Sequence, residues 1–343
     1  MRAALGRLRG ALAPLARRGA HTAAPREVHP TAIIADGARL GDGVRIGPYC
    51  VIGPHAVLEE GVMLHSHVVV AGHTSIGARS TVFSFATVGA EPQDLKYRGE
   101  RSELIVGRDC RIFEYAHLSG GTAGGGGATT IGDGCLLMSH VHVAHDCVIG
   151  ERVILASHSA LAGHVAVGNA AQVSGYACVH QRVSVGAGSF VGAASVLVAD
   201  LLPYGLAIGN RAALAGLNLR GLRRAQAPSD EVRAMLRAFR YTFGDASAGS
   251  VTYGPMALPH RECIAERAVE VQQATPQFAR VAQMADFVLA RQGRAAMRAL
   301  CLPPQRDGAD RRFTSRQQNS EAFHGSESHI GVTTLSDVQY PAH

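Results

Sequence analysis

A branched aliphatic residue stands at every sixth position over most of the stretch from Val28 to Leu197. Helices repeat at about 3.6 residues and strands at two, so a period of six indicates a repeat architecture in which each hexad is one short flat strand. Three hexads would make one coil of 18 residues, and coils would stack about 4.8 Å apart into a prism roughly 40 Å long. The register runs through Val28, Ile34, Leu40, Ile46, Ile52, Leu58, Leu64, Val70, Ile76, Val82, Val88, Val106, Ile112, Leu118, Ile131, Leu137, Val143, Ile149, Leu155, Leu161, Val167, Val173, Val179, Val185, Val191 and Leu197.

Small residues recur four places after the aliphatics, as at Ala56, Cys110 and Ser159. A small residue facing a large one fits a narrow interior, and glycine often follows the aliphatic, where a tight corner favours it. This pattern predicts an all-β chain, a left-handed parallel β-helix of hexapeptide repeats of about nine coils, followed by a C-terminal α-helical domain. The hand comes from that class of proteins, because the general crossover rule favours the opposite one.

Composition divides the chain into four expected segments. Residues 1–27 contain six arginines, one acid and no serine, with leucines at three- and four-residue steps, which predicts a mitochondrial targeting segment; a disordered basic tail is the alternative. We expect the β-helix at 28–203 and the helical domain at 204–302. Residues 303–343 are polar and lack periodicity, so we expect a disordered tail there.

Composition also limits the partners. The first segment carries most of the net charge of +6, so the remainder gives no reason to expect nucleic-acid binding. No apolar run approaches the roughly 20 residues of a membrane span. The seven cysteines include no CxxC pair, and four of them occupy small inward positions, so we expect neither a bound metal nor a disulfide, and no cofactor.

Two interruptions break the hexad register. Residues 94–105 leave the coil after Val88, and an insertion of this kind on a corner usually carries function. Residues 124–130, GGGGATT, form a second excursion that is either a flap or a bulge.

Beyond Pro203 the pattern becomes helical. In chain order, we expect helical sequence from Leu214, Ser229 as the N-cap of a helix, a loop at 244–259, a helix from Arg261 to Ala274, and Thr275 and Pro276 as the N-cap and first residue of a helix that ends near Leu300.

Histidines gather on consecutive coils. Residues 18 apart should stack directly, so His145, Gly163 and Gln181 form a ladder on the outward side. His164 and His180 belong to the same coils.

A neighbouring face carries a second stack, made of His140, His158 and Tyr176, with His142 at the corner between the two. Such a concentration is unusual for a surface that needs only to be soluble. Ordinary exposed histidines remain the alternative.

Two chemistries suit this cluster. In one, His145 is a general base, an outward Asp146 orients its imidazole, and the Gly163 amide reaches an oxyanion. In the other, His140 and His145 bind a metal together with a histidine from a neighbouring subunit.

Lys96 is the only lysine in a chain otherwise supplied with arginine. It lies in the first interruption beside Asp94. A compact ammonium suits a phosphate or a sugar hydroxyl, and chance survival of a single lysine is the alternative.

Several segments resemble the UDP-N-acetylglucosamine O-acyltransferase family of lipid A biosynthesis. They are HPTAII, IGPYCVIGPH, SHVVVAGHTSIG, QDLKY, LLMSHVHVAHDC, LAGHV, VHQ, LPYGLAIGN and GLNLRGLRR, and together they cover roughly residues 28–245. The resemblance implies a homotrimer of left-handed β-helices. Members of the family transfer a 3-hydroxyacyl group from acyl carrier protein to the 3-hydroxyl of UDP-N-acetylglucosamine. The predicted targeting segment suggests an organellar eukaryotic version.

The resemblance also implies roles for individual residues. His145 would be the general base, Asp146 its orienting partner and the Gly163 amide the oxyanion donor. Ala193 matches the position that limits acyl length, which predicts a medium-length acyl group. The remaining substrate contacts would come from Asp94 and Lys96 of an adjacent subunit, and from His142, His164, His180, Gln181, Asn218 and Arg224.

Three departures from the family pattern stand out. The family's HRGT reads Ser119-Gly120-Gly121-Thr122 here, its LANN ends in His158, and an Asn becomes His140. These bear on affinity and nucleotide recognition more than on the reaction class.

Two other functions remain open from the sequence. The spacing of His140 and His145 matches the ligand pair of γ-type carbonic anhydrases and of the related respiratory-complex subunits, which are also hexapeptide trimers. A catalytically silent trimeric scaffold is the third possibility.

Overall fold

The computed structural model describes residues 25–244, 261–291 and 300–301. The predicted targeting segment up to residue 24, the predicted loop from residue 245 and the predicted tail from residue 303 lie outside these ranges.

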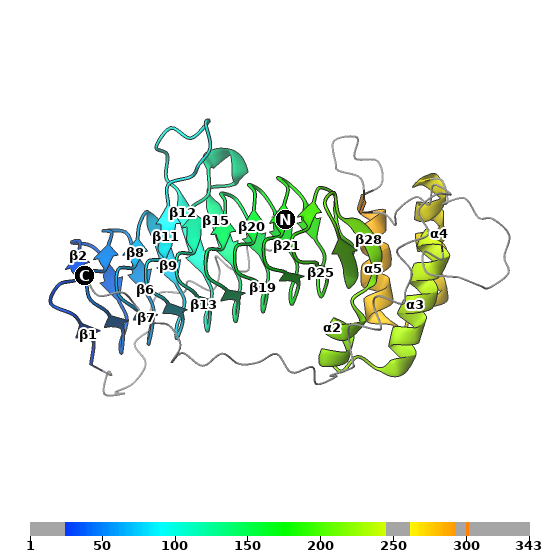
Figure 1. The fold of residues 1–343 in the computed structure, drawn as a ribbon, viewed down its shortest axis with the longest axis horizontal. Coiled ribbons are helices and arrows are strands. Elements are labelled where there is room, and N and C mark those ends of the chain that lie inside the picture. Colours follow the sequence, from blue (N-terminus) through cyan, green and yellow to red (C-terminus); the bar gives the residue numbers. More distant parts are fainter. Residues whose placement is uncertain (1–24, 245–260, 292–299, 302–343) are drawn as a thin grey trace, which may run out of the picture. The chain divides into compact units, whose positions relative to one another are not determined.

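The β-structure consists of three parallel sheets whose strands alternate along the chain, which is the arrangement of a left-handed parallel β-helix (Figure 1). The first sheet has 11 strands: β1 (Glu27–Val28), β4 (Arg45–Ile46), β7 (Met63–Leu64), β10 (Thr81–Val82), β13 (Arg111–Ile112), β16 (Leu136–Leu137), β19 (Ile154–Leu155), β22 (Gln172–Val173), β25 (Phe190–Val191), β27 (Gly205–Ile208) and β28 (Ala213–Leu217). The second has nine: β2 (Ile33–Ile34), β5 (Val51–Ile52), β8 (Val69–Val70), β11 (Thr87–Ala90), β14 (His117–Ser119), β17 (His142–Val143), β20 (Ala160–Leu161), β23 (Cys178–Val179) and β26 (Val196–Leu197). The third has eight: β3 (Arg39–Leu40), β6 (Val57–Leu58), β9 (His73–Ile76), β12 (Glu103–Val106), β15 (Ala128–Ile131), β18 (Val148–Ile149), β21 (Ala166–Val167) and β24 (Ser184–Val185).

The hexad register is confirmed. Each strand from β1 to β26 contains one predicted aliphatic, and uninterrupted coils pair residues 18 apart, as His142 with Ala160. The aliphatics from Ile46 onward are buried, and small residues such as Ala56 and Cys110 are fully buried opposite them. Only the first coil is open at its end, where Val28 is 41% exposed.

Both interruptions leave the same edge of the prism, between the second and third sheets (Figure 1). The first spans 91–102 rather than 94–105, because β12 already begins at Glu103. The second contains a short 3-10 helix, η1 (Ala123–Gly125), and ends where β15 begins at Ala128. The two touch each other, since the Ala123 N–H donates to Glu100 Oε1 at 3.3 Å.

The sheet continues past Pro203, and the chain from Ala213 to Leu217 is β28 rather than helix. β27 extends the first sheet in parallel and β28 closes it in an antiparallel pair. A helix begins only after Asn218, whose side chain accepts a hydrogen bond from the Gly221 N–H and caps it.

The helices are α2 (Leu219–Arg224), α3 (Ser229–Phe243), α4 (Arg261–Ala274) and α5 (Ala279–Leu289). The predicted span of α4 is confirmed. Pro228, not Ser229, is the N-cap of α3, because its extended backbone precedes the first helical turn.

The predicted start at Thr275 is wrong. Its hydroxyl donates to the Val271 carbonyl at 2.7 Å and so completes the end of α4, and α5 begins three residues beyond Pro276. None of the helices in the described part of the chain has the length and apolar content needed to span a bilayer.

The helical region is tied to the last coils by polar contacts as well as by a shared apolar core. Arg291 donates to Asp200 Oδ2 at 2.7 Å, while the other oxygen of Asp200 accepts the Ser184 N–H. Tyr204 is hydrogen-bonded to Gln283 at 2.5 Å.

Candidate active site

His145 and His164, two of the histidines predicted to act, lie on the corner between the second and third sheets. Asp146 and His164 occupy equivalent positions on successive coils, both with φ of +61°. His145 precedes Asp146 and is 6% exposed, and Asp146 is 2% exposed. We call residues 144–146 and 162–164 the covered corner, because the two excursions lie over it.

Asp146 is buried, not outward as the hexad pattern suggests, and its carboxylate is fully engaged. Oδ1 accepts the Thr122 N–H at 2.8 Å, and Oδ2 accepts the Thr122 hydroxyl at 2.7 Å. The Asp146 N–H donates to the Thr129 hydroxyl at 2.8 Å. A Cβ on Gly125 would lie 1.9 Å from the Asp146 carboxyl carbon, so only glycine allows η1 to approach this closely.

His145 is oriented by Asp146. Its Nδ1 lies 2.8 Å from Asp146 Oδ2. An ionised carboxylate can only accept hydrogen bonds, so Nδ1 carries the proton and donates, and Nε2 is left as a lone-pair base. The pair therefore has the geometry of a general base with its orienting acid.

Gly163 stands against the free edge of this imidazole, as the ladder of 18-residue coils predicts. A Cβ at Gly163 would lie 2.6 Å from Cε1 and 2.7 Å from Nε2 of His145, so any side chain would displace the ring. Among the described residues the Gly163 N–H has no hydrogen-bond partner. A donor left open beside a base is suited to an oxyanion.

His164 completes the covered corner. Its ring meets that of His145 edge-on at 5.0 Å, and its Nδ1 lies 3.7 Å from Asp146 Oδ2. Burial lowers the pKa of His164 below its usual value, and Arg182 acts in the same direction, against the opposing charge of Asp146. The neutral imidazole is thus favoured near pH 7.

His142 lies on the outer face of β17 rather than at a corner. It stacks on His117 of β14 with ring centroids 5.2 Å apart. Burial, followed by the charge of His117, lowers the pKa of His142. His117 was not predicted, and its buried Nδ1 has no partner in the described chain.

The first excursion brings Asp94 to the same site. Asp94 Oδ2 lies 4.0 Å from His145 Nε2 of its own chain, so this approach needs no adjacent subunit. The Lys96 N–H donates to Asp94 Oδ1 at 3.0 Å and, with the nearby His145, lowers the pKa of the Asp94 carboxyl. The Lys96 side chain is exposed.

The other predicted substrate residues lie outside this cluster. His180 and Gln181 are exposed one coil beyond Gly163, and Ala193 is exposed on a different corner. Asn218 is 6% exposed and already bonded, since its Nδ2 donates to the Gly188 carbonyl at 2.9 Å besides capping α2.

Arg224 makes one polar contact, from Nη2 to Gln172 Oε1 at 2.8 Å, and is otherwise exposed.

His140 belongs to a different corner, between the first and second sheets. There, seven rings stack on successive coils with centroids 4.5 to 5.2 Å apart, and we call this set the ring corner: Tyr49, His67, Phe85, Tyr115, His140, His158 and Tyr176.

A metal site shared by His140 and His145 is therefore not supported within one chain, because β17 separates the two corners. In the described chain, one group has metal-like spacing: His145, Asp146 and His164. Its carboxylate already accepts three hydrogen bonds, which suits an orienting acid better than a metal ligand.

Sequence reasoning missed Thr122, Gly125 and Thr129, which hold Asp146. The signal available was the second excursion itself, since a glycine-rich segment inserted into a regular coil allows close backbone approach.

Two families match parts of this chain. The family described as "Bacterial transferase hexapeptide (six repeats)" matches residues 128–163, and "Udp N-acetylglucosamine O-acyltransferase; Domain 2" matches residues 200–297. The fold and the His145–Asp146 pair thus define a transferase of the hexapeptide class.

The acyl-[acyl-carrier-protein]–UDP-N-acetylglucosamine O-acyltransferase of Sulfurovum is 50% identical over 221 residues, which is 64% of this chain and 85% of the relative. The UDP-N-acetylglucosamine acyltransferase structure from Campylobacter jejuni superposes with a TM-score of 0.69 at 37% identity and covers 77% of this chain and 96% of that one. The Arabidopsis structure covers 80% and 99%, with a TM-score of 0.67 at 30% identity. The chain belongs to the UDP-N-acetylglucosamine O-acyltransferase family, and the γ-type carbonic anhydrase interpretation is not supported.

Proposed function

We propose that this chain transfers a 3-hydroxyacyl group from acyl carrier protein to the 3-hydroxyl of UDP-N-acetylglucosamine, the first step of a lipid A-type glycolipid synthesis. Membership of the family gives the substrate class. The observation that best supports this reaction is the buried His145–Asp146 pair. Nε2 of His145 lies beside Gly163, which has no side chain.

The proposed reaction is a direct attack. His145 Nε2 takes the proton of the sugar 3-hydroxyl as its oxygen attacks the thioester carbonyl. The Gly163 N–H donates to the oxyanion that forms, and Asp146 stabilises the imidazolium. When the carbon–sulfur bond breaks, the imidazolium returns its proton to the carrier's sulfur.

The structure gives no support for a covalent intermediate on the cysteine next to Asp146. The thiol nearest in sequence, Cys147, is fully buried, and burial raises its pKa to about 12. The thiolate is the nucleophilic form, so this cysteine is inert near neutral pH.

The remaining substrate contacts are assigned by the family resemblance. Asp94, His142 and His164 lie at or beside the covered corner and would shape the sugar site. Lys96, His180, Gln181, Asn218 and Arg224 would contact the phosphates, the nucleotide or the carrier.

We propose a homotrimer as the working form, because several of these residues are exposed and spread over different faces of one chain. Light scattering of the purified protein tests this, with three chains per particle expected.

The location is a separate proposal. The arginine-rich segment 1–27 supports import into mitochondria, as an organellar eukaryotic version of the enzyme. A fluorescent protein fused to residues 1–27 should reach mitochondria, and a cytosolic signal would contradict the proposal.

The decisive experiment incubates the protein with UDP-N-acetylglucosamine and 3-hydroxyacyl carrier proteins of graded length. We expect an O-acylated nucleotide sugar, with the best turnover at medium chain length because of Ala193. Failure of every carrier protein to react would favour the silent trimeric scaffold.

A further inference from the structure

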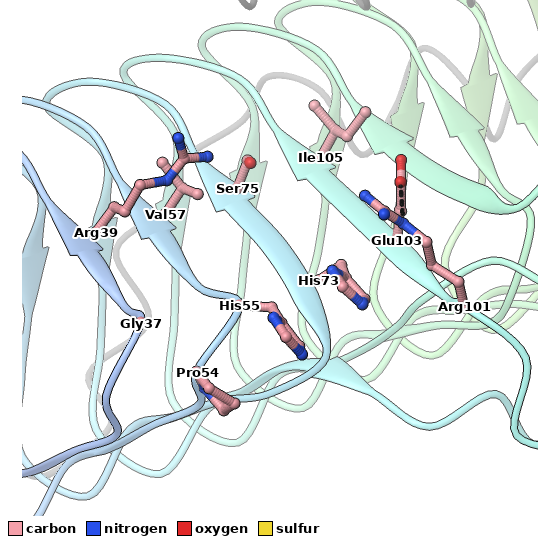
Figure 2. A pocket seen from close by; sticks show the side chains of 10 residues that line it. All are labelled: Gly37, Arg39, Pro54, His55, Val57, His73, Ser75, Arg101, Glu103 and Ile105. Atoms are coloured by element: carbon pink, nitrogen blue, oxygen red, sulfur yellow. Dashed lines mark hydrogen bonds and ion pairs between the residues drawn. The ribbon is translucent and has the colours of Figure 1, made fainter.

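A cavity lies on the outer face of the third sheet, and no residue of the covered corner lines it (Figure 2). Its volume is about 400 Å³, within the range of about 300–1,000 Å³ that is usual for small-molecule sites. Strands β3, β6, β9 and β12 form its floor, and Arg101 at the end of the first excursion contributes to its lining. Nothing in the proposed acyl transfer uses it.

The strand register explains why these side chains meet. Arg39 pairs with Val57, Val57 with Ser75, and Ser75 with Ile105, so the four form one row across the sheet.

A second row runs along the adjoining corner. His73 is the register partner of Glu103, and its imidazole stacks on that of His55 with centroids 4.1 Å apart and planes within 7°. Figure 2 shows the two parallel rings lying between Arg39 on one side and the Arg101–Glu103 pair on the other.

The charge of the cavity is positive. Its acid, Glu103, is already held by Arg101 at 2.8 Å. The Arg39 guanidinium and both imidazoles have no hydrogen-bond or ion-pair partner among the described residues. An unpaired guanidinium beside two unpaired imidazoles, with the nearby carboxylate already bonded to Arg101, provides the donors of an anion site.

The apolar wall indicates more than a bare ion. Val57, Ile105 and Pro54 line the cavity beside the cationic groups. A single phosphate group would engage Arg39 and the imidazoles and leave the apolar surface free for a small organic group.

We propose that this cavity binds the phosphate group of a small phosphomonoester, with Arg39, His55 and His73 as its donors. The cavity is a site separate from the active site, and acyl transfer does not depend on it.

The environment of His73 adds a pH dependence. Burial and then the charges of Arg101 and His55 lower the pKa of His73, while Glu103 opposes them. A bound anion stabilises the imidazolium, so binding and protonation favour each other, and affinity should fall as the pH rises.

The test is calorimetric titration of the full chain with inorganic phosphate and with glycerol 3-phosphate. Arg39→Gln and the double variant His55→Asn/His73→Asn should each lose about tenfold or more in affinity, since a hydrogen bond to a charged group is removed. Arg45→Gln, an exposed arginine of the first sheet, is the matched control and should bind as the wild type does. Tighter binding of glycerol 3-phosphate than of phosphate would identify the organic ester as the occupant, and the reverse would identify the free ion.

Sulfate serves as a probe whose own charge is constant, and its affinity should increase from pH 8 to pH 5.5. In all binding variants the acyl-transfer rate should stay at the wild-type value. The binding proposal is therefore tested independently of the catalytic one. Absence of binding in the assembled protein, or equal loss in Arg45→Gln, would overturn it.

Discussion

Two corners of the same β-helix have the same backbone conformation but different surroundings. Asp146 and His164 on the covered corner and Tyr115 and His158 on the ring corner all have φ between +59° and +61°. The ring corner is uninterrupted, and its tyrosines are more than half exposed. On the covered corner the excursions at 91–102 and 120–127 exclude water from Asp146.

The backbone of a coil therefore does not decide where chemistry occurs. A left-handed position places a side chain at the corner in either case, and asparagine, aspartate and histidine tolerate it best. What differs is the cover. The second inserted loop supplies the Thr122 N–H and hydroxyl donors, and the carboxylate of Asp146 is buried beneath it next to His145.

Among changes to the covered corner, Gly163→Ala should lower kcat strongly. The new methyl would sit 2.6 Å from the His145 ring and move it, and a displacement of about 1 Å can cost about 100-fold in rate. Steady-state kinetics should show this loss in kcat with a little-changed melting temperature. Gly175→Ala, whose Cβ would lie 3.3 Å from the Ser157 carbonyl oxygen and needs a shift of only a few tenths of an ångström, is the control and should remain within a few-fold of wild type.

A smaller effect is expected from the cover itself. Thr122→Val removes the hydroxyl bond to Asp146 Oδ2 and keeps the backbone N–H bond to Oδ1. Loss of one hydrogen bond to a charged group predicts about a tenfold decrease in kcat. Thr81→Val on the outer face of β10 provides a comparison without such a bond. Unchanged turnover of Thr122→Val would mean that Asp146 does not need the hydrogen bond from the Thr122 hydroxyl for catalysis.

Acid should weaken the region of the covered corner. Burial lowers the pKa of His117, His142 and His164, so the folded chain binds their protons less readily than the unfolded one. Their contribution to the free energy of unfolding is complete above the ordinary histidine pKa of about 6.5 and is lost as the pH falls through it. Thermal melts between pH 8 and pH 5 should show this decrease. The double variant His117→Gln/His142→Gln should show a shallower decrease, and an identical slope would contradict the assignment.

The ring corner should tolerate change best. Tyr115→Asn loses ring stacking worth about 0.5–1.5 kcal/mol but relieves a left-handed backbone cost of about 1–2 kcal/mol. We expect a change of less than about 1 kcal/mol in denaturant unfolding and wild-type turnover. A loss of activity would show that the ring corner takes part in catalysis or in assembly of the site.

Part of this difference between the two corners can be predicted from the sequence. A coil of 18 residues sets which side chains stack, so the neighbourhood of His145 and Gly163 follows from spacing alone. The burial of Asp146 does not follow, because its cover comes from Thr122, 24 residues earlier in an irregular glycine-rich segment. In the same way, Thr275 followed by Pro276 is a typical start of a helix, yet the Thr275 hydroxyl donates to the Val271 carbonyl at the end of the preceding helix.

The most direct test of His145 as the general base compares turnover of His145→Ala with that of His140→Ala, one from each corner. The general-base role of His145 predicts that His145→Ala loses about 10²–10⁴-fold in kcat, the usual contribution of a general base, while His140→Ala stays within a few-fold of wild type. Near-wild-type turnover of His145→Ala would contradict it, and so would an equal loss in both variants accompanied by loss of stoichiometric zinc.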